Sequence, residues 1–183
     1  MTLSLLDGGR EGDVALYDIA PGGEHRQRRN GMAYWLMKSE PDEVGIDHLA
    51  ANPERAFEWT GVRNYQARNF MRDQMQPGDQ LLFWHSSCPQ PGIAGIAEVV
   101  GAVHADSSQF DPASPYFDPK SNPEQPRWQC VDVRFVRKTA LLSPAVLRQH
   151  PALLEMTVLQ RGNRLSITPV TPQQWHYLME NLL

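Results

Sequence analysis

The sequence predicts an α+β fold, a small mixed β-barrel of about five or six strands with several short helices around it. Fifteen prolines and thirteen glycines in 183 residues indicate many turns, which are typical of a β-rich domain. Segments with strand periodicity and segments with helix periodicity follow one another in mixed order, without the regular alternation of a doubly wound sheet. The length is that of one domain with a core of its own.

Residues 1–31 differ in composition from the rest of the chain. Glycine pairs and a polar run carry no sustained apolar periodicity, so we expect a flexible N-terminal extension; the alternative for the short run 14–17 is an edge strand. Arg26, Arg28 and Arg29 leave two interpretations open, a basic arm for phosphate or a solvated leader ahead of a natural start near Met32. Residues 32–183 are predicted to form the folded domain.

Five segments have the pattern of β-strands, at residues 34–39, 80–85, 92–104, 128–138 and 165–168. The first and third are apolar on both faces, which predicts a central position in the sheet. Glycines within the third suit a strongly bent barrel strand. The fourth alternates between apolar and polar residues, which predicts one buried face.

Helices are predicted between these strands and at the end of the chain. A short helix is expected around 46–51, and Ala67, Phe70, Met71 and Met75 form the buried stripe of a second. Ser143-Pro144 and the capping box Thr171–Gln174 begin two further helices, since Ser and Thr cap the first turn and Pro suits its first position. Residues 105–127 read as a long structureless loop, a feature that is often functional.

Composition excludes several classes of function. A formal net charge of −4 argues against strong nonspecific attachment to nucleic acid. Cys88 and Cys130 lack metal or redox spacing, the six histidines show no paired metal spacing, and no glycine-rich phosphate loop follows a strand. No apolar run is long enough to span a bilayer. We therefore expect a cytoplasmic protein without a cofactor, a catalytic site or a membrane partner.

The segment Glu58–Tyr65 carries the most unusual combination of residues. Trp59 or Tyr65 can stack a planar base, Asn64 can read its edge, and Arg63 with Arg68 can hold a phosphate. A core position for Trp59 and a solvated helix face remain the alternative interpretation. Polar groups gathered around an aromatic ring serve a core poorly, and this favours the binding interpretation for the cluster as a whole.

Three smaller sets of polar residues lie at strand ends and in the long loop. Ser39 ends the first strand within Lys38–Pro41, and His85 with Ser86 ends the second, where ligands of a barrel mouth are common. Each of these also has a purely structural interpretation, such as a satisfied histidine or a surface ion pair. Lys120 lies in the long loop, which we consider either a lid over the pocket or ordinary surface.

At this point the sequence resembles a known family, the EVE domain of the PUA-like superfamily, and is similar to bacterial relatives of thymocyte nuclear protein. The resemblance covers residues 33–183 and is carried, in order, by the motifs Tyr34–Pro41, Trp59–Asn69, Pro77–Asp79, Phe83–Ser86, Gly92-Ile93, Pro119–Ser121, Arg127-Trp128 and Gly162–Ser166. It implies a PUA-like mixed barrel and a pocket with aromatic walls that binds a modified base, with modified cytosine as one candidate, in DNA or RNA. Phe83-Trp84 departs from the Phe-Tyr of many relatives, which puts one pocket wall in doubt.

The resulting hypothesis is a reader that binds a flipped, modified base and performs no chemistry on it. The predicted ligand-binding residues are Ser39, Trp59, Arg63, Asn64, Tyr65, Arg68, Asn69, His85, Ser86 and Lys120. Nucleic acid is the predicted partner, and the expected oligomeric state is a monomer or weak dimer. The alternative hypothesis is a sensor or enzyme for a free nucleotide or other small molecule in the same cavity.

Overall fold

The computed structural model describes residues 17–19, 25–27 and 31–183, in two compact units, Met1–Gly31 and Met32–Leu183. In the first unit, β1 (Tyr17–Ile19) and β2 (His25–Gln27) pair antiparallel in a sheet of their own. Residues 14–16, Arg28 and Arg29 lie outside the described residues. Flexibility of this extension therefore stays a prediction.

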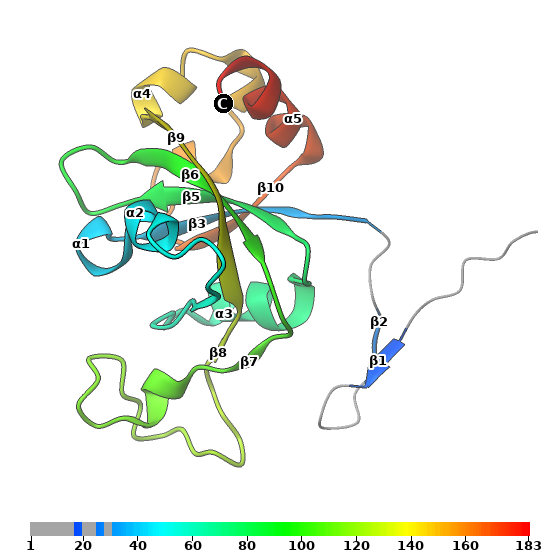
Figure 1. Cartoon of the computed structure of the whole chain (residues 1–183), viewed down its shortest axis with the longest axis vertical. Coiled ribbons are helices and arrows are strands. Elements are labelled where there is room, and N and C mark those ends of the chain that lie inside the picture. The colour runs from blue at the N-terminus through cyan, green and yellow to red at the C-terminus, as the bar shows by residue number, and fades with distance from the viewer. Residues whose placement is uncertain (1–16, 20–24, 28–30) are drawn as a thin grey trace, which may run out of the picture. The chain divides into compact units, whose positions relative to one another are not determined.

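The second unit is a curled, mixed sheet with short helices around it (Figure 1). Most of its strand and helix starts agree with the sequence predictions. In chain order its elements, with η for 3-10 turns and for one π-helical turn, are β3 (Tyr34–Ser39), α1 (Pro41–Val44), α2 (Ile46–Ala50), β4 (Phe57–Glu58), α3 (Tyr65–Asn69), the π-helical η1 (Phe70–Gln74), β5 (Gln80–His85), β6 (Gly92–Val99), β7 (His104–Ala105), η2 (Ser107–Phe110), β8 (Gln129–Cys130), β9 (Asp132–Leu142), α4 (Pro144–Leu147), η3 (Pro151–Leu153), η4 (Thr157–Leu159), β10 (Ile167–Val170) and α5 (Pro172–Asn181).

Six strands form the main sheet in the order β10-β3-β5-β6-β9-β4. The central pair β3 and β5 runs parallel, with Ser39 opposite His85, and the other neighbours are antiparallel. Because the parallel strands end at the same edge, residues 39 and 85–87 meet at one rim of the sheet. This rim forms the floor of the site described below.

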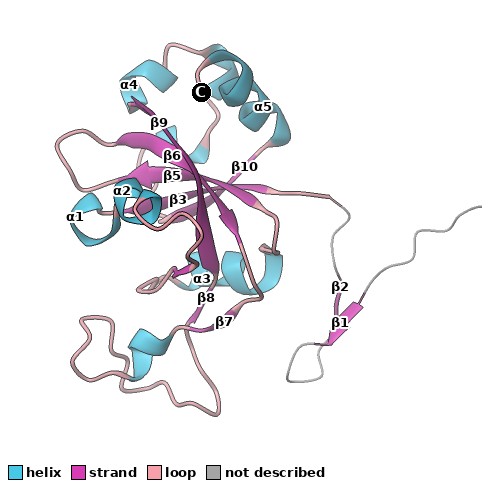
Figure 2. Ribbon diagram, in the orientation of Figure 1, coloured by secondary structure: helices cyan, strands magenta, loops and turns pink. Residues whose placement is uncertain are grey.

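Both faces of the sheet are buried, as the apolar strands predict. Trp35, Met37 and Phe83 point to one face, where they pack with α2, α3 and η1, whereas Leu36 and Leu82 point to the other, under the C-terminal helices. Alternation along each strand assigns its residues to the two faces in turn. Figure 2 shows α4 and α5 at one end of the molecule, while the part around β7 and β8 consists mostly of loop.

Strand β6 is bent, as its glycines predict, although it ends at Val99 and not at residue 104. Its pairing with β9 shifts register between Ile93 and Gly95. A Cβ on Gly95 would lie 2.6 Å from the Ile46 side chain and 2.8 Å from the Arg137 carbonyl oxygen. Glycine at this position therefore allows α2 to pack closely on the sheet.

The long loop is not structureless, and this prediction is wrong. Residues 106–128, here called the lobe, are closed at their base by the β7–β8 pair and contain η2. The buried amide of Gln109 donates to the carbonyls of Asp106 and Trp128, at 2.7 and 2.8 Å, and its oxygen accepts from Ser121 and the Trp128 amide. One side chain thus ties together three separate stretches of the lobe, which composition alone did not indicate.

Candidate functional site

A cavity of about 690 Å³ opens at the rim where β3 and β5 end. Its volume lies in the range of pockets that hold small organic ligands. Its lining comes from strand ends, α1, the segment after β4, the lobe and the approach to β10, and consists of Lys38, Ser39, Glu40, Glu43, Val44, Leu49, Phe57, Glu58, Trp59, Thr60, Gly61, Val62, Arg63, Ser86, Ser87, Tyr116, Val133, Arg164 and Ser166.

The apolar part of the wall is centred on Trp59. Its indole is 8% exposed and meets the Phe83 ring edge to face, with centroids 5.4 Å apart and planes at 73°. The Trp59 amide donates to the Val131 carbonyl at 2.9 Å, which fixes the backbone of the segment at the junction between β8 and β9. Trp59 is therefore both a core residue and a cavity wall, so the two interpretations of this residue are compatible.

Arg63 joins the cavity wall to the lobe through a saturated set of hydrogen bonds. Its guanidinium contacts the Asp106 carboxylate at 2.7 Å, Ser108 Oγ at 3.0 Å, and the carbonyls of Val62 and Tyr116. Burial alone would raise the pKa of Asp106, but hydrogen bonds from Arg63, Ser108 and the Gly61 amide outweigh it and hold that pKa below its usual value. Arg63 thus has a structural role. Its guanidinium has no free N–H group left to hold a phosphate, as the sequence had predicted it would.

Tyr116 connects the lobe with α1, which lines another part of the cavity. Its hydroxyl donates to the Glu43 carboxylate of α1 at 3.1 Å, and its ring packs on the backbone of Gly61. A Cβ on Gly61 would lie 2.8 Å from that ring, and φ at Gly61 is +81°. Glycine is needed here for both the backbone conformation and the close approach of the tyrosine.

The polar lining offers donors and acceptors of both charge signs. Within the described residues the Lys38 ammonium has no hydrogen-bond or ion-pair partner, and partial burial lowers its pKa. Ser39 Oγ donates to the Val44 carbonyl at 2.7 Å, and Ser86 Oγ donates to the Ser39 carbonyl at 3.3 Å, so each hydroxyl oxygen can still accept. A ligand in this cavity therefore meets the unpaired Lys38 ammonium together with the carboxylates of Glu40, Glu43 and Glu58.

The structure brings four of the ten predicted site residues together and leaves six outside the cavity lining. Those inside are Ser39, Trp59, Arg63 and Ser86, and those outside are Asn64, Tyr65, Arg68, Asn69, His85 and Lys120.

Asn64, expected to read a base edge, instead caps α3. Its Oδ1 accepts from the Ala67 amide at 3.0 Å. An asparagine ahead of a helix satisfies an otherwise unpaired amide, and this local bond competes with any ligand for the same oxygen. Asn69 Oδ1 likewise accepts from the Arg68 guanidinium at 2.9 Å.

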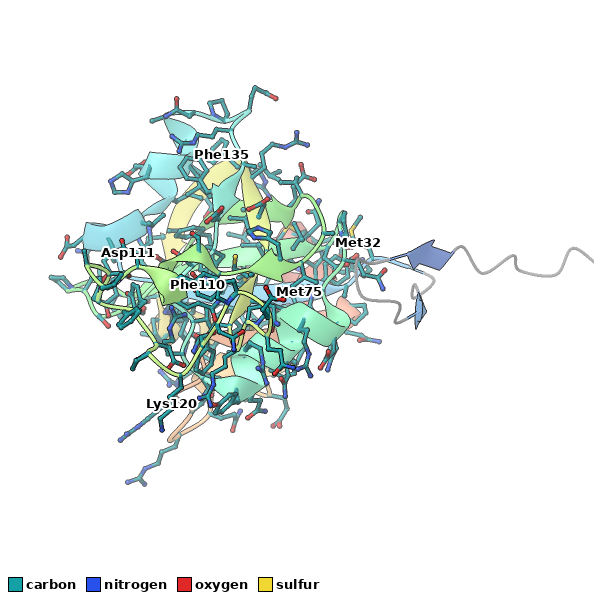
Figure 3. The ribbon with its side chains drawn as sticks, turned by 90° about the horizontal axis from the view of Figure 1, so that it is seen from below. Met32, Met75, Phe110, Asp111, Lys120 and Phe135 are labelled. Carbon is teal, nitrogen blue, oxygen red and sulfur yellow. The ribbon has the colours of Figure 1, made fainter. Side chains whose placement is uncertain are left out.

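His85 and Lys120 lie beside the cavity and at the surface, respectively. His85 Nε2 accepts from the Ile46 amide at 3.1 Å, and burial lowers its pKa, so the ring remains neutral and holds α2 on the sheet. Lys120 is exposed, and Figure 3 shows it at the outer edge of the molecule. The lobe does reach the cavity, but through Tyr116.

Sequence reasoning missed several lining residues, among them Lys38, Glu43, Tyr116 and Arg164. Lys38 is the immediate neighbour of Ser39, and Arg164 lies in the Gly162–Ser166 motif on which the resemblance depends, so both carried a signal. Nothing around Tyr116 distinguishes it from an ordinary loop aromatic. Its position depends on contacts with residues far away in the sequence.

Another group of polar side chains has the composition of a nucleophilic triad. Cys130 Sγ lies 3.6 Å from His104 Nδ1, and His104 Nε2 lies 3.1 Å from the Asp132 carboxylate. Burial raises the pKa of the Cys130 thiol, well away from the thiolate that nucleophilic chemistry requires. The described residues contain no group of three or more metal-ligating side chains, and none of their helices is long and apolar enough to cross a membrane.

The sheet order, the two packed faces and a cavity at the rim of the parallel pair define a PUA-like ligand-binding domain. The EVE domain model matches residues 33–181, and the chain belongs to the EVE domain family. Human thymocyte nuclear protein 1 is 40% identical over 168 residues, 82% of this chain and 74% of that protein.

Solved structures give the same result. A Pseudomonas putida protein is 49% identical, with a TM-score of 0.76 over 80% of this chain and 97% of that one. Human THYN1 in complex with 5-methylcytosine-containing DNA is 38% identical, with a TM-score of 0.74 over 80% of this chain and 95% of that one. In both cases nearly the whole of the solved structure superposes on this chain, which supports a shared fold throughout the domain.

Proposed function

We propose that this protein reads a modified cytosine in DNA by accepting the unstacked base into the cavity at the rim of β3 and β5. The observation that carries the proposal is the cavity itself, which combines a buried aromatic wall at Trp59 with an unpaired Lys38 and several carboxylates. The structure of a family member with 5-methylcytosine-containing DNA supports the choice of base.

The polar lining matches the hydrogen-bonding edge of cytosine. Cytosine presents one amino donor and two acceptors, N3 and O2. The carboxylates of Glu40, Glu43 and Glu58 can accept from the amino group, and the Lys38 ammonium can donate to an acceptor. Leu49, Val133 and the other apolar lining residues offer a surface for a 5-methyl group, since a methyl group gains free energy by leaving water.

Recognition without catalysis is part of the proposal. In the lining, Arg63 is fully engaged and Ser86 has no adjacent base that could activate it, since His85 Nε2 is occupied by the Ile46 amide. DNA is the proposed partner over RNA on the strength of the human relative's complex. A cytoplasmic location and a monomer or weak dimer remain predictions, and the relatives' name suggests that the nucleus also hosts this family.

The decisive experiment is a calorimetric titration of the protein with matched ligands. The ligands are two nucleosides, 5-methyl-2′-deoxycytidine and 2′-deoxycytidine, and two duplexes with one central 5-methylcytosine or cytosine. Each duplex has 12 base pairs and is about one helical turn long. We expect tighter binding of the methylated member of each pair. Trp59→Phe should lower the affinity for the methylated ligands about tenfold, because loss of part of a stacking surface costs about 1–3 kcal/mol of binding free energy.

A matched variant controls for general destabilisation. Trp175→Phe alters a tryptophan of similar burial, 5% exposed, on the opposite face of the sheet, and should leave binding unchanged. Equal binding of methylated and unmethylated ligands, or no binding, would refute the proposal. Binding of nucleosides without any binding of duplex would favour a small-molecule sensor.

A further inference from the structure

Five side chains form a continuous stack that runs from the cavity to the surface. The Arg63 guanidinium lies between the Tyr116 and Trp128 rings, 5.5 and 5.4 Å from their centroids. Trp128 stacks on Tyr65 at 4.9 Å and 23°, and the Arg68 guanidinium lies 5.0 Å from the Tyr65 centroid. Each guanidinium attracts the faces of the rings beside it, and Trp128 stacks directly on Tyr65, so an unbroken series of favourable contacts joins the five side chains.

The two ends of the stack lie in different environments. Tyr116 and Arg63 line the cavity. Tyr65 is 53% exposed and lies outside it, one of the few large aromatic residues of the domain that faces solvent to this extent. The stack therefore links the proposed base pocket to a definite place on the outer surface.

Two arginines contact Tyr65 at this outer end, Arg68 at the face of the ring and Arg127 at the hydroxyl. Arg68 Nη1 donates to the Arg127 carbonyl at 2.6 Å, and Arg127 Nη1 lies 3.5 Å from Tyr65 Oη and 3.8 Å from the Asp118 carboxylate. Asp118 is largely covered, at 16% exposure, and already accepts from the Trp128 indole and the Lys120 amide. The local balance of charge at the surface is therefore positive, in a protein whose net charge is −4.

These arginines differ from Arg63 in how many donors they have left. Arg63 uses Nε and both Nη atoms within the protein. Within the described residues, Arg68 Nη2 and the Nε and Nη2 atoms of Arg127 make no hydrogen bond. Burial and the nearby positive charge of Arg72 lower the pKa of Arg68, an unfavourable environment that a bound anion would relieve.

We propose that Arg68, Arg127 and the Tyr65 hydroxyl form a phosphate site for the DNA strand that flanks the base in the cavity. This inference rests on the proposed function, since it assigns a second contact to the same ligand. Guanidinium groups with several free N–H donors suit phosphate oxygens, and contacts of this kind position a strand without reading its sequence. The stack fixes the distance between the phosphate and the base, so it sets the register of the strand.

The test compares a ligand that contains only the base with one that also contains the strand. Arg68→Gln and Arg127→Gln are titrated with 5-methyl-2′-deoxycytidine and with the 12-base-pair duplex carrying one 5-methylcytosine, about one turn in length. We expect unchanged nucleoside affinity and a loss of about five- to tenfold for the duplex in low salt. The slope of log affinity against log salt should decrease by about 1 for each variant, the signature of one lost phosphate contact.

Arg148→Gln is the control for the loss of one arginine elsewhere, since Arg148 directly follows α4, and α4 lies away from the lobe (Figure 1). Thermal unfolding of each variant establishes that it folds, and Arg127→Gln keeps the test valid if loss of the Arg68–Arg127 contact destabilises the domain. Tyr65→Phe, which removes only the hydroxyl, should give a smaller loss for the duplex.

The outcomes separate this inference from the proposed function. The phosphate site is overturned if Arg68→Gln and Arg127→Gln have the same duplex affinity and salt slope as Arg148→Gln. If methyl-dependent nucleoside binding is retained in that case, the proposed function still stands. Wild-type protein without methyl-dependent binding overturns both. Competition for the duplex by polyglutamate, lost in Arg127→Gln, would instead identify the site as one for acidic protein segments.

Discussion

The two faces of the sheet are covered in different ways. Under the C-terminal helices, the cover is apolar packing, with Trp175 stacked on Tyr34 at 4.5 Å and 14° and Leu147, Leu153 and Leu178 buried. On the other face, beyond α2 and α3, the cover is held by hydrogen bonds to Asp106 and Gln109. Side chains packed by shape fill their space, whereas loops held by directional bonds can enclose a void. The comparison explains why the cavity described above borders the lobe, where the cover is held by directional bonds.

The largest expected effect comes from the helix-covered face. Trp175→Ala should lower the free energy of unfolding by about 3–5 kcal/mol, because it leaves a large void against Tyr34. Urea unfolding measures the loss. Nucleoside affinity of the remaining folded protein should not change, and a change would mean that the two faces are coupled.

Breaking the polar cover should be nearly as damaging to stability and should also abolish binding. Asp106→Ala leaves the partly buried Arg63 guanidinium without its counter-charge, which costs about 3 kcal/mol. Because the pKa of Asp106 is lowered in the folded protein, its contribution is present above the ordinary pKa of about 3.9 and is lost as pH falls through the folded value. The difference between variant and wild type in urea unfolding should therefore shrink in acid. A difference independent of pH would contradict this account.

A smaller effect is expected from Gly61→Ala, and the chain offers a matched control. Gly61 and Gly162 share φ of +81°, but a Cβ on Gly162 would meet nothing within 4 Å. Strain at positive φ costs about 1 kcal/mol in both, and only Gly61→Ala also displaces Tyr116. Gly61→Ala should thus be the less stable variant and the only one with weaker nucleoside binding. Equal effects would show that the Tyr116 contact is unimportant.

The smallest expected effect concerns the base of the lobe. Burial lowers the pKa of His104, but the hydrogen bond to Asp132, with the Ala105 carbonyl and Glu58, raises it overall. A raised pKa means that the contribution is present below about pH 6.5 and is lost as pH rises through the folded value. We expect less than about 1 kcal/mol, since the pair is partly exposed. His104→Gln and Asp132→Asn should both remove this loss between pH 6 and pH 9 in urea unfolding.

Local patterns predicted the framework well. The strands at 34–39 and 80–85, the cap at Ser143 and the capping box at Thr171 appear as expected because each depends on neighbouring residues. The predicted strand 128–138 is instead divided at Val131 into β8 and β9, and β9 continues to Leu142. Periodicity does not reveal such an interruption, because the apolar alternation continues through it.

The site was predicted only in part, for the same reason. Ser39, Ser86 and Trp59 follow from strand ends and an unusual motif, but the role of Asn64 was decided by a bond to the Ala67 amide that competes with ligand binding. Tyr116 entered the cavity through contacts with Glu43 and Gly61, which lie 73 and 55 positions earlier in the chain. Pairings at such separations are set by the folded topology, which a single sequence does not contain.

The parallel pairing of β3 and β5 allows the walls of the cavity to change in evolution while its floor stays the same. Ladder hydrogen bonds hold the floor of the cavity at Ser39 and Ser86, independently of the connection that supplies Trp59 and of the lobe that supplies Tyr116. New walls can therefore be tried by substitution in those two segments without changing the register of the sheet. A designer who wants a reader for another base can keep the six strands and vary the walls alone.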